Sequence, residues 1–516
     1  MKKKGMICRR GDYNMVKESL DFIYKQQKEL SLLSGIGALL SWDQMTYMPR
    51  MGANWRSEQT ALIAKWSHER IISDKLWKHI TKLSEHLDEL AENDQNVVKR
   101  LKKDVEKARK IPSDFVEKMT KTTTLAYTAW EEARNKNDFK VFSPHLEKII
   151  ELEKQYCDFI NLPGPRYNSL LDDYEEGMTT SRLKKEFNYL KSKVVDILNE
   201  IMVSDVYKEQ ESLKKKGFSK EKQKRICELV FEKMNLPRDR SRWDVSIHPF
   251  TTSIGYDDVR ITTNFEHPNG LFSFFSMIHE AGHALYELGF PRGCYEYTVI
   301  SDAASVGLHE SQSRFWENMI ARSEYFWKYF YKIFKENFSE EFIDINFEKW
   351  FKYVNQVKPS LIRVEADELT YPLHVILRFE LETKLIDEKI SVSELPVLWN
   401  EKIDELLGVT PKNDREGVLQ DMHWSNGSFG YFPTYIIGTI YASQLFKTLT
   451  EENNNVLDEI EKAEFVNILN WLRENIHKYG RLMTADEIIK NVCGEGLNSK
   501  VFVNYLKNKY FTLYEV

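Results

Sequence analysis

His279-Glu280-Ala281-Gly282-His283 lies within the run LFSFFSMIHEAGHALYE, which spans residues 271–287. Apolar residues recur in this run at steps of three and four, which predicts one helix with a single buried stripe. Because residues four apart share a helix face, His279 and His283 are expected to point at one metal ion, with Glu280 beside the water that the ion activates. The pattern predicts metal-assisted hydrolysis, with zinc as the metal.

The residues around this motif agree with a helix of defined length. Gly289 and Pro291 are expected to end it. A helix interior favours alanine over glycine, so Gly282 predicts that another backbone or side chain approaches closely at this position. These features favour a metal-binding helix over a core or surface helix with two ordinary histidines.

A catalytic zinc usually has three protein ligands and one open position, so a third donor is required. The segment 302–323 predicts a helix opened by Ser301. His309 and Glu310 are neighbours on it, and since helix neighbours diverge by about 100°, only one of them should face the metal. We choose Glu310, because a carboxylate commonly completes a two-histidine zinc site; a surface ion pair with Arg314 is the alternative. His309 is then expected to support a ligand, to pack, or to contact substrate.

The order of several motifs resembles one known family, the M32 metallocarboxypeptidases, also called the carboxypeptidase Taq family. Besides HExxH, the matching motifs are His248-Pro249-Phe250, Asp258-Val259-Arg260-Ile261-Thr262 (DxRxT), His309-Glu310-Ser311-Gln312, Gly417-Val418-Leu419-Gln420-Asp421-Met422-His423-Trp424 (GxxQDxHW), Ile362–Glu368 and Leu40–Pro49. Such an ordered set over nearly the whole chain is far more specific than HExxH alone.

The resemblance implies a zinc-dependent exopeptidase that removes single residues from peptide C-termini with broad side-chain tolerance. It implies a mainly α, large two-lobed metallopeptidase fold with a deep cleft and a small β-sheet near the active site, assembled as a homodimer. His279, His283 and Glu310 match the metal ligands and Glu280 matches the general base; cobalt is the expected substitute for zinc. The run Tyr297–Asp302 departs from the family pattern. It lacks the usual proline and shortens a glutamate to Asp302, which would have less reach to orient a ligating histidine.

The expected reaction assigns further roles. Glu280 would take a proton from water and pass it to the leaving amine. The tetrahedral oxyanion needs donors in addition to the metal, and His423, Tyr431 and Tyr435 are the candidates. All three lie in the stretch 423–435, whose glycine and aromatic content predicts a substrate-clasping loop. Core packing is the alternative role for each tyrosine.

A carboxypeptidase also needs a fixed cation for the terminal carboxylate, most naturally a bidentate arginine. Arg363 opens an acidic, helix-like segment that ends at Pro372, whereas Arg260 lies in a strand-like run. We favour Arg363, because Arg260 has Asp257 or Asp258 as alternative partners.

The strand-like region 243–265 predicts a small sheet whose edge aligns the peptide backbone. His248, within it, is a candidate substrate contact, and a structural turn histidine before Pro249 is the alternative.

Composition is compatible with this interpretation. With 516 residues and 42% hydrophobic content, the chain can bury a large core. A net charge of −6 argues against a nucleic-acid-binding protein, and no stretch approaches a membrane span. The basic start Met1–Lys4 has no apolar run after it, so a secretory signal is not expected. The widely spaced cysteines predict reduced thiols and a cytoplasmic location: Cys8, Cys157, Cys227, Cys294 and Cys493.

Helical signals dominate the chain, and no repeat or low-complexity linker interrupts it. We expect one fold over 1–516, with a mainly helical N-terminal lobe (1–240) and a motif-bearing catalytic lobe (241–516). Leu83–Lys110 predicts one long charged helix, Ser143 and Pro144 a helix start, and Thr484 with Glu487 a capping box.

Two other functions are alternatives. A related HExxH oligoendopeptidase would cut inside short peptides and would need no anchor for a free C-terminus. An inactive helical peptide-binding protein would fail to bind stoichiometric metal.

Overall fold

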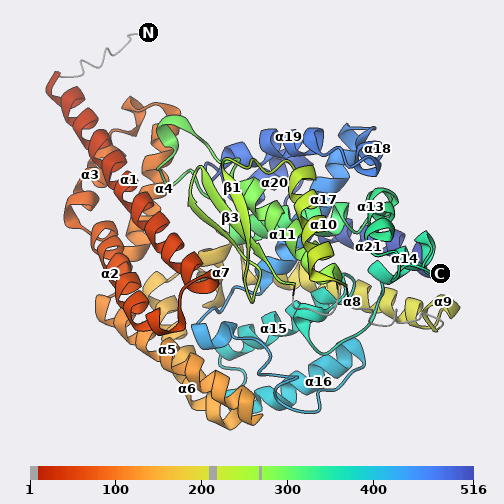
Figure 1. Ribbon diagram of the computed structural model, residues 1–516. Coiled ribbons are helices and arrows are strands. Elements are labelled where there is room, and N and C mark those ends of the chain that lie inside the picture. Colours follow the sequence, from red (N-terminus) through yellow and green to blue (C-terminus); the bar gives the residue numbers. More distant parts are fainter. Residues whose placement is uncertain (1–9, 209–217, 266–269) are drawn as a thin grey trace, which may run out of the picture.

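The computed structural model describes residues 10–208, 218–265 and 270–516, so the predictions on Met1–Lys4 and Cys8 lie outside the described residues. Helices make up most of the fold, which confirms the mainly α class (Figure 1). Those before the sheet are α1 (Arg10–Thr46), α2 (Ala53–Ile71), α3 (Asp74–Glu85), α4 (Glu92–Lys110), α5 (Ser113–Lys136), α6 (Phe139–Ile160), α7 (Tyr167–Tyr174), α8 (Thr180–Met202), α9 (Asp205–Lys208) and α10 (Lys220–Lys233). Those after it are α11 (Gly270–Glu287), α12 (Val306–Arg314), α13 (Glu324–Asn337), α14 (Phe347–Val354), α15 (Tyr371–Ile386), α16 (Leu395–Leu407), α17 (Pro433–Glu452), α18 (Val456–Glu461), α19 (Val466–Asn475), α20 (Ala485–Cys493) and α21 (Ser499–Tyr514).

The predicted small sheet is present between α1 and α11 (Figure 1). Its strands are β1 (Ser241–Val245), β2 (Thr251–Gly255) and β3 (Asp258–Thr263), in the order β1-β3-β2. β1 runs parallel to β3, and β2 runs antiparallel to it. Val259 and Ile261 of β3 are fully buried, and α11 contacts both β3 and β2. The sheet therefore packs directly against the helix that carries the HExxH motif.

One large hydrophobic core contains residues from both sides of position 240, such as Phe187 of α8 and Phe274 of α11. A smaller core holds α1, α3 and α4 together and includes Ile300 from the segment before α12. The division into lobes at residue 240 stays a prediction. No helix in the three described ranges is long and apolar enough to cross a membrane.

Several predicted helix boundaries are wrong, each for a local reason. The helix expected over 302–323 begins at Val306, because the Ser305 hydroxyl accepts a hydrogen bond from Leu308 N (2.8 Å) and caps it there. It is α-helical only to Arg314 and continues as a π-helix over Phe315–Ile320.

The long helix expected over Leu83–Lys110 is interrupted, because Leu90 and Ala91 adopt extended backbone between α3 and α4. Pro144 lies inside α6, which begins at Phe139 behind the Asp138 cap. Pro372 lies in the first turn of α15 instead of ending a helix, since proline suits that position. The capping box of Thr484 and Glu487 is confirmed at the start of α20.

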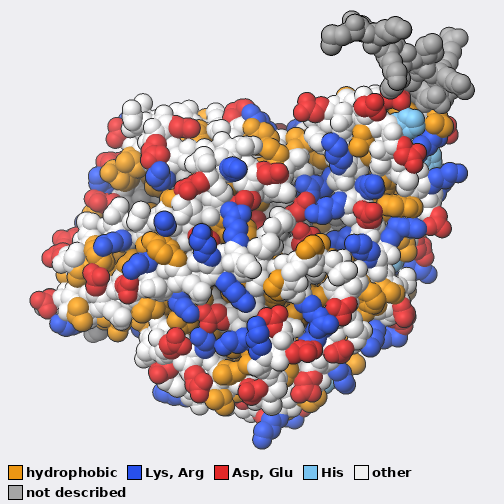
Figure 2. Space-filling view, turned by 180° about the vertical axis from the view of Figure 1, so that it is seen from behind, with side chains coloured by type: hydrophobic (Ala, Val, Ile, Leu, Met, Phe, Trp, Pro, Cys, Tyr) orange, Lys and Arg blue, Asp and Glu red, His pale blue; other side chains and the backbone are white. Residues whose placement is uncertain are grey.

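α2 differs from the other long helices because none of its residues is buried. Trp55, Leu62 and Trp66 on this helix are 78%, 45% and 42% exposed, and Leu32 and Ile36 of the neighbouring α1 are 52% and 47% exposed. On the face drawn in Figure 2, acidic, basic and hydrophobic side chains are interspersed. The α1–α2 hairpin thus presents an apolar surface, which we call the hairpin patch.

A buried carboxyl from the N-terminal half fixes the start of α12. Glu175, directly after α7, is 1% exposed and accepts a hydrogen bond from Gly307 N (3.1 Å). Burial raises the pKa of Glu175 to about 8, although the Ser305 hydroxyl and the Gly307 N–H act in the opposite direction. This contact ties α12 to α7 across more than a hundred residues of sequence.

The raised pKa of Glu175 predicts a pH-dependent stability term. Below about pH 4 the carboxyl is protonated in both states, and as pH rises towards 8 the unfolded chain ionises it more readily than the folded protein does. Wild type should therefore lose stability relative to Glu175→Gln between about pH 5 and about pH 8, by a few kcal/mol in order of magnitude. Urea unfolding of both proteins across this range measures the difference, with the exposed Glu117→Gln as control. If the difference in unfolding free energy between wild type and Glu175→Gln does not change with pH, the raised pKa of Glu175 is contradicted.

Candidate active site

The HExxH motif lies in the second half of α11. His279 and His283 stand one turn apart, with ring centroids separated by 4.9 Å. Their side chains keep 20% and 14% of their surface exposed, although most of the helix is buried. The helix ends at Glu287, as Gly289 and Pro291 predict. The two imidazoles therefore share a face that solvent can reach.

α12 brings Glu310 to these histidines. Its Oε2 lies 3.6 Å from His279 Nε2 and 3.4 Å from His283 Nε2. Ligand atoms about 2.1 Å from a tetrahedral zinc ion stand about 3.4 Å from one another, so the spacing fits such an ion. The donor atoms of all three residues lie within 4.8 Å of one another. The three side chains predicted as ligands thus meet at one point.

The outer nitrogen of each imidazole has its own partner. His279 Nδ1 lies 2.8 Å from Glu317 Oε2, a residue of the π-helical segment. His283 Nδ1 faces the backbone oxygen of His309 at 3.1 Å and His309 Nδ1 at 2.6 Å. His309 therefore contacts the outer nitrogen of His283, a candidate ligand. Supporting a ligand is one of the roles predicted for His309. Such contacts orient imidazoles toward a metal.

Sequence reasoning missed Glu317 and left open whether Asp302, with its shorter reach, could orient a ligating histidine. Asp302 accepts a hydrogen bond from its neighbour Ala303, and it interacts electrostatically with His309, the residue that contacts His283. The signal for Glu317 was its spacing: residues 310, 314 and 317 follow one helix face at steps of four and three.

Opposite charges are paired around the three candidate ligands. Arg314 donates to Glu310 Oε1 (2.6 Å) and to Glu317 Oε2 (3.3 Å). Burial alone would raise the pKa of Glu310, but Arg314 and His279 hold it well below 4.5. Burial and the neighbouring His309 lower the pKa of His283 to about 3, which keeps that imidazole neutral. An ionised carboxylate and a neutral imidazole are the forms that bind zinc.

Glu280 is buried beside this cluster, on the side of the sheet. Thr251 of β2 donates to Glu280 Oε2 (2.6 Å) and to its backbone oxygen (3.0 Å). Burial raises the pKa of Glu280, while His279 and the Thr251 hydroxyl act in the opposite direction. The sheet thus fixes the orientation of the carboxylate next to the candidate metal ligands.

The three proposed oxyanion donors come together. His423 Nε2 lies 3.2 Å from the Tyr435 hydroxyl, and the rings of Tyr431 and Tyr435 are 5.3 Å apart. Burial raises the pKa of Tyr431 to about 12, and the negative charge of Glu310 adds to that effect. The expectation of one loop is only partly right, because Tyr435 lies in the first turn of α17.

Arg363 is 6% exposed and belongs to a buried cluster of charges. It donates to Asp421 Oδ1 (2.8 Å) and to the Tyr371 hydroxyl (3.1 Å), and Arg378 pairs with the other oxygen of Asp421 at 2.5 Å. Two guanidinium groups therefore share one carboxylate, which leaves an excess positive charge. The guanidinium of Arg314 lies over the Tyr371 ring, 4.8 Å from its centre, so Tyr371 separates this cluster from the candidate metal ligands.

The other two residues predicted to bind substrate have different surroundings. Arg260 forms a bidentate pair with Asp258 (2.7 Å for both contacts) and lies 4.3 Å from the centre of the Trp42 ring. His248 is exposed in the loop between β1 and β2, where its backbone oxygen accepts a hydrogen bond from Ser246. Neither residue has a described contact with the three candidate ligands.

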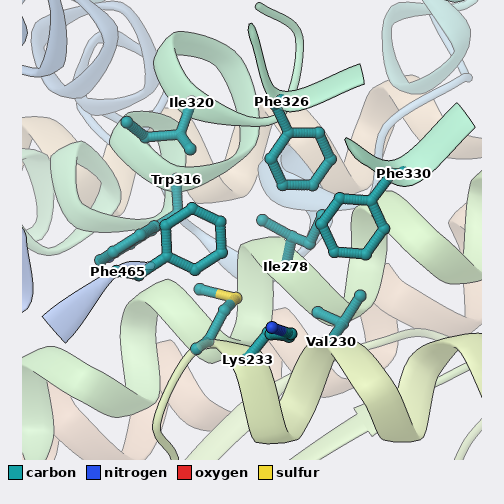
Figure 3. A pocket seen from close by; sticks show the side chains of 9 residues that line it. Val230, Lys233, Ile278, Trp316, Ile320, Phe326, Phe330 and Phe465 are labelled. Atoms are coloured by element: carbon teal, nitrogen blue, oxygen red, sulfur yellow. The ribbon is translucent and has the colours of Figure 1, made fainter. Parts of the chain in front are cut away.

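A small cavity lies behind the helices of the site (Figure 3). Its volume is about 10 Å³, and its lining includes Ile278, Trp316 and Phe330. A cavity of this volume with a mainly apolar lining holds one water molecule at most. It is a packing defect of the core, and the candidate ligands do not line it.

Comparisons with known proteins agree with the geometry. Residues 22–510 match the family model described as carboxypeptidase Taq (M32) metallopeptidase. Carboxypeptidase 1 of Bacillus subtilis is 38% identical over 94% of this chain and 97% of its own length. Thermostable carboxypeptidase 1 of Pyrococcus furiosus is 37% identical over 96% and 98%. A solved structure of the Pyrococcus furiosus carboxypeptidase superposes with a TM-score of 0.92 at 37% identity, over 96% of this chain and 99% of that one.

These matches cover nearly the whole chain, and the metallopeptidase family implies a divalent metal ion for which the three candidate ligands form a site. The chain therefore belongs to the M32 family of metallocarboxypeptidases and is a peptide hydrolase.

Proposed function

We propose that this chain is a zinc-dependent carboxypeptidase that releases single amino acids from the C-termini of peptides with broad side-chain tolerance. The observation that best supports this function is that two clusters, one of candidate metal ligands and one of positive charge, lie on either side of Tyr371. The cluster of His279, His283 and Glu310 suits hydrolysis, and the positively charged cluster around Arg363 suits a terminal carboxylate. An endopeptidase would have no use for the second cluster.

The donor set supports zinc, with cobalt as a substitute. Two imidazoles and one carboxylate form a common catalytic zinc set, and the distances between them fit a tetrahedral ion. When bound by these residues, zinc would act as a Lewis acid and lower the pKa of a water molecule towards neutrality.

Glu280 is the general base in this proposal. Thr251 occupies its Oε2, which leaves Oε1 to accept a proton from the attacking water and to return it to the leaving amine. Because the carboxylate is buried and hydrogen-bonded, it is held in position before the substrate arrives.

His423, Tyr431 and Tyr435 are proposed to stabilise the oxygen of the scissile carbonyl as negative charge develops on it. The mutual contact of His423 and Tyr435 and the proximity of Tyr431 to Glu310 support this role. The edge of β2, next to Glu280, would align the substrate backbone, with His248 as a further contact at the rim.

Arg363 is the proposed anchor for the terminal carboxylate. It is almost completely buried, and a carboxylate bound there would balance the excess positive charge that it shares with Arg378 and Asp421. Arg260 forms a bidentate pair with Asp258, one cation to one carboxylate, so it leaves no excess positive charge and is the weaker candidate.

A homodimer and a cytoplasmic location complete the proposal. The hairpin patch, with α2 entirely unburied, supports association of two copies through this surface. Sedimentation equilibrium should give a dimer for wild type and a monomer for the double variant Leu62→Asp with Trp66→Asp. A monomeric wild type would overturn the proposed homodimer.

The cysteines support the proposed cytoplasmic location. Among the described cysteines, Cys157, Cys227, Cys294 and Cys493 are free, which supports a reducing compartment.

The zinc-loaded protein should degrade an unmodified peptide of about ten residues from its C-terminus, one residue at a time. The same peptide with an amidated C-terminus should stay intact, and a chelator should stop the reaction. Mass spectrometry over time measures all three outcomes. Internal cuts in both peptides would identify an oligoendopeptidase, and no cleavage would favour a peptide-binding protein.

Glu280→Gln should retain zinc but lose turnover by about a thousandfold or more, because the amide cannot accept the proton. Metal content by plasma emission spectrometry and kcat on the free peptide measure the two parts. Near wild-type kcat in this variant would exclude Glu280 as the base.

Glu317→Gln should weaken zinc binding by about 10- to 100-fold, because the amide is a poorer acceptor for the His279 imidazole and pairs less well with Arg314. Competition with a chromophoric chelator measures the zinc dissociation constant. Glu324→Gln, at the exposed start of α13, is the control. An unchanged dissociation constant would remove Glu317 from the site.

Arg363→Ala should raise KM for peptides with free C-termini by about 100-fold, since the bound carboxylate would lose its cation. Arg260→Ala should change KM by about threefold at most. Steady-state kinetics of both variants decide between the two arginines, and the reverse pattern would assign the anchor to Arg260.

A further inference from the structure

The segment between His423 and Tyr431 is held at both ends by one buried side chain. Glu382, on α15, is 0% exposed. Its Oε1 accepts a hydrogen bond from the indole N–H of Trp424 (2.8 Å), directly after His423. Its Oε2 accepts one from Gly430 N (3.0 Å), directly before Tyr431. One carboxylate thus fixes the chain on either side of the intervening loop.

A third donor comes from the N-terminal half. The Tyr167 hydroxyl, on α7, donates to the same Oε2 of Glu382 at 2.5 Å. Close packing leaves this arrangement little freedom. Gly430 has a φ of +87°, and a Cβ there would lie 2.7 Å from the backbone oxygen of Leu170 on α7. The loop is therefore confined between α7 and the Glu382 carboxylate.

The three donors need an acceptor with two oxygens. Burial raises the pKa of Glu382 to about 7, and the hydrogen bonds from Tyr167 and Gly430 oppose a larger rise. A glutamine at this position would have one acceptor oxygen and one N–H₂ group. If the amide oxygen faces Gly430, the N–H₂ group faces the Trp424 indole, and two donors then meet in a buried site.

We infer that Glu382 is a positioning residue for the reaction, which holds His423 and Tyr431 where they face the substrate carbonyl. Its described hydrogen bonds are with Tyr167, Trp424 and Gly430 and not with the candidate metal ligands, and it acts through the backbone on both sides of the loop. This inference rests on the proposed function, since His423 and Tyr431 are the proposed oxyanion donors. It concerns kcat, because the terminal carboxylate is held separately by Arg363.

The test is the kinetics of Glu382→Gln in the zinc-loaded protein. We expect kcat on the free peptide to fall by about 10- to 100-fold and KM to change by about threefold at most. Zinc content should stay near wild type, and urea unfolding should stay cooperative, although the opposed donors lower its midpoint. Amide hydrogen exchange in residues 423–431 should become faster, while exchange in α11 and α12 should not.

Glu153→Gln is the matched control. Glu153, on α6, is also a buried carboxyl beside this loop, since a Cβ at Gly427 would lie 3.0 Å from its Oε1. Burial and the nearby Asp173 raise the pKa of Glu153 well above its ordinary value, so an amide preserves its neutral form. This variant should keep the wild-type kcat.

A second variant keeps the test valid if Glu382→Gln folds poorly. Trp424→Phe removes one donor and should lower kcat less than Glu382→Gln does. The double variant, Glu382→Gln with Trp424→Phe, lacks the indole N–H that would face the new amide N–H₂ group. Its fold-loss in kcat should therefore be smaller than the product of the fold-losses in the two single variants.

The outcomes separate the inference from the proposed function. A wild type without chelator-sensitive release of C-terminal residues would overturn the function and the inference together. An active wild type with unchanged kcat in Glu382→Gln and Trp424→Phe would overturn the inference alone. Loss of kcat together with loss of zinc or of cooperative unfolding would assign Glu382 to folding and would also overturn its positioning role.

Discussion

The candidate metal site depends on the close contact of α12 with two neighbouring helices at glycines. A Cβ at Gly282 of α11 would lie 2.7 Å from the backbone oxygen of Gln312. A Cβ at Gly438 of α17 would lie 2.8 Å from the Cβ of Glu310 itself. Any larger residue at either position would push α12 away and withdraw Glu310 from the histidines, because packed helices do not yield by a whole methyl group without cost.

This packing buries charged groups, and the protein satisfies them by pairing. Glu310, Glu317 and Arg314 form one network that includes the His279 imidazole. Removing a single member of such a network leaves an uncompensated charge, which is more costly than the pair is stabilising. The network therefore orients the His279 imidazole and the Glu310 carboxylate toward one point.

The sequence predicted what depends on local spacing. The i, i+4 histidines, the third candidate ligand on the following helix, the small sheet and the close approach at Gly282 could all be seen in it. Boundaries set by single caps were missed, such as the start of α12 at Ser305. Glu317 was missed as well, although its spacing from Glu310 was a usable signal. The shared partner of Trp424 and Gly430 could not be predicted, because nothing local to them points to Glu382.

The short helix α7 illustrates why such long-range contacts matter. Glu175 at its end caps α12, Tyr167 donates to Glu382, and Tyr174 packs against Tyr431 with ring centroids 5.2 Å apart. α7 and the residue directly after it thus contact both the helix that carries Glu310 and the segment that carries the proposed oxyanion donors. These two segments belong to different parts of the sequence. Their shared contacts with α7 and Glu175 therefore fix the distance between them. The distance between the candidate metal ligands and the proposed oxyanion donors is therefore set from the N-terminal half of the chain.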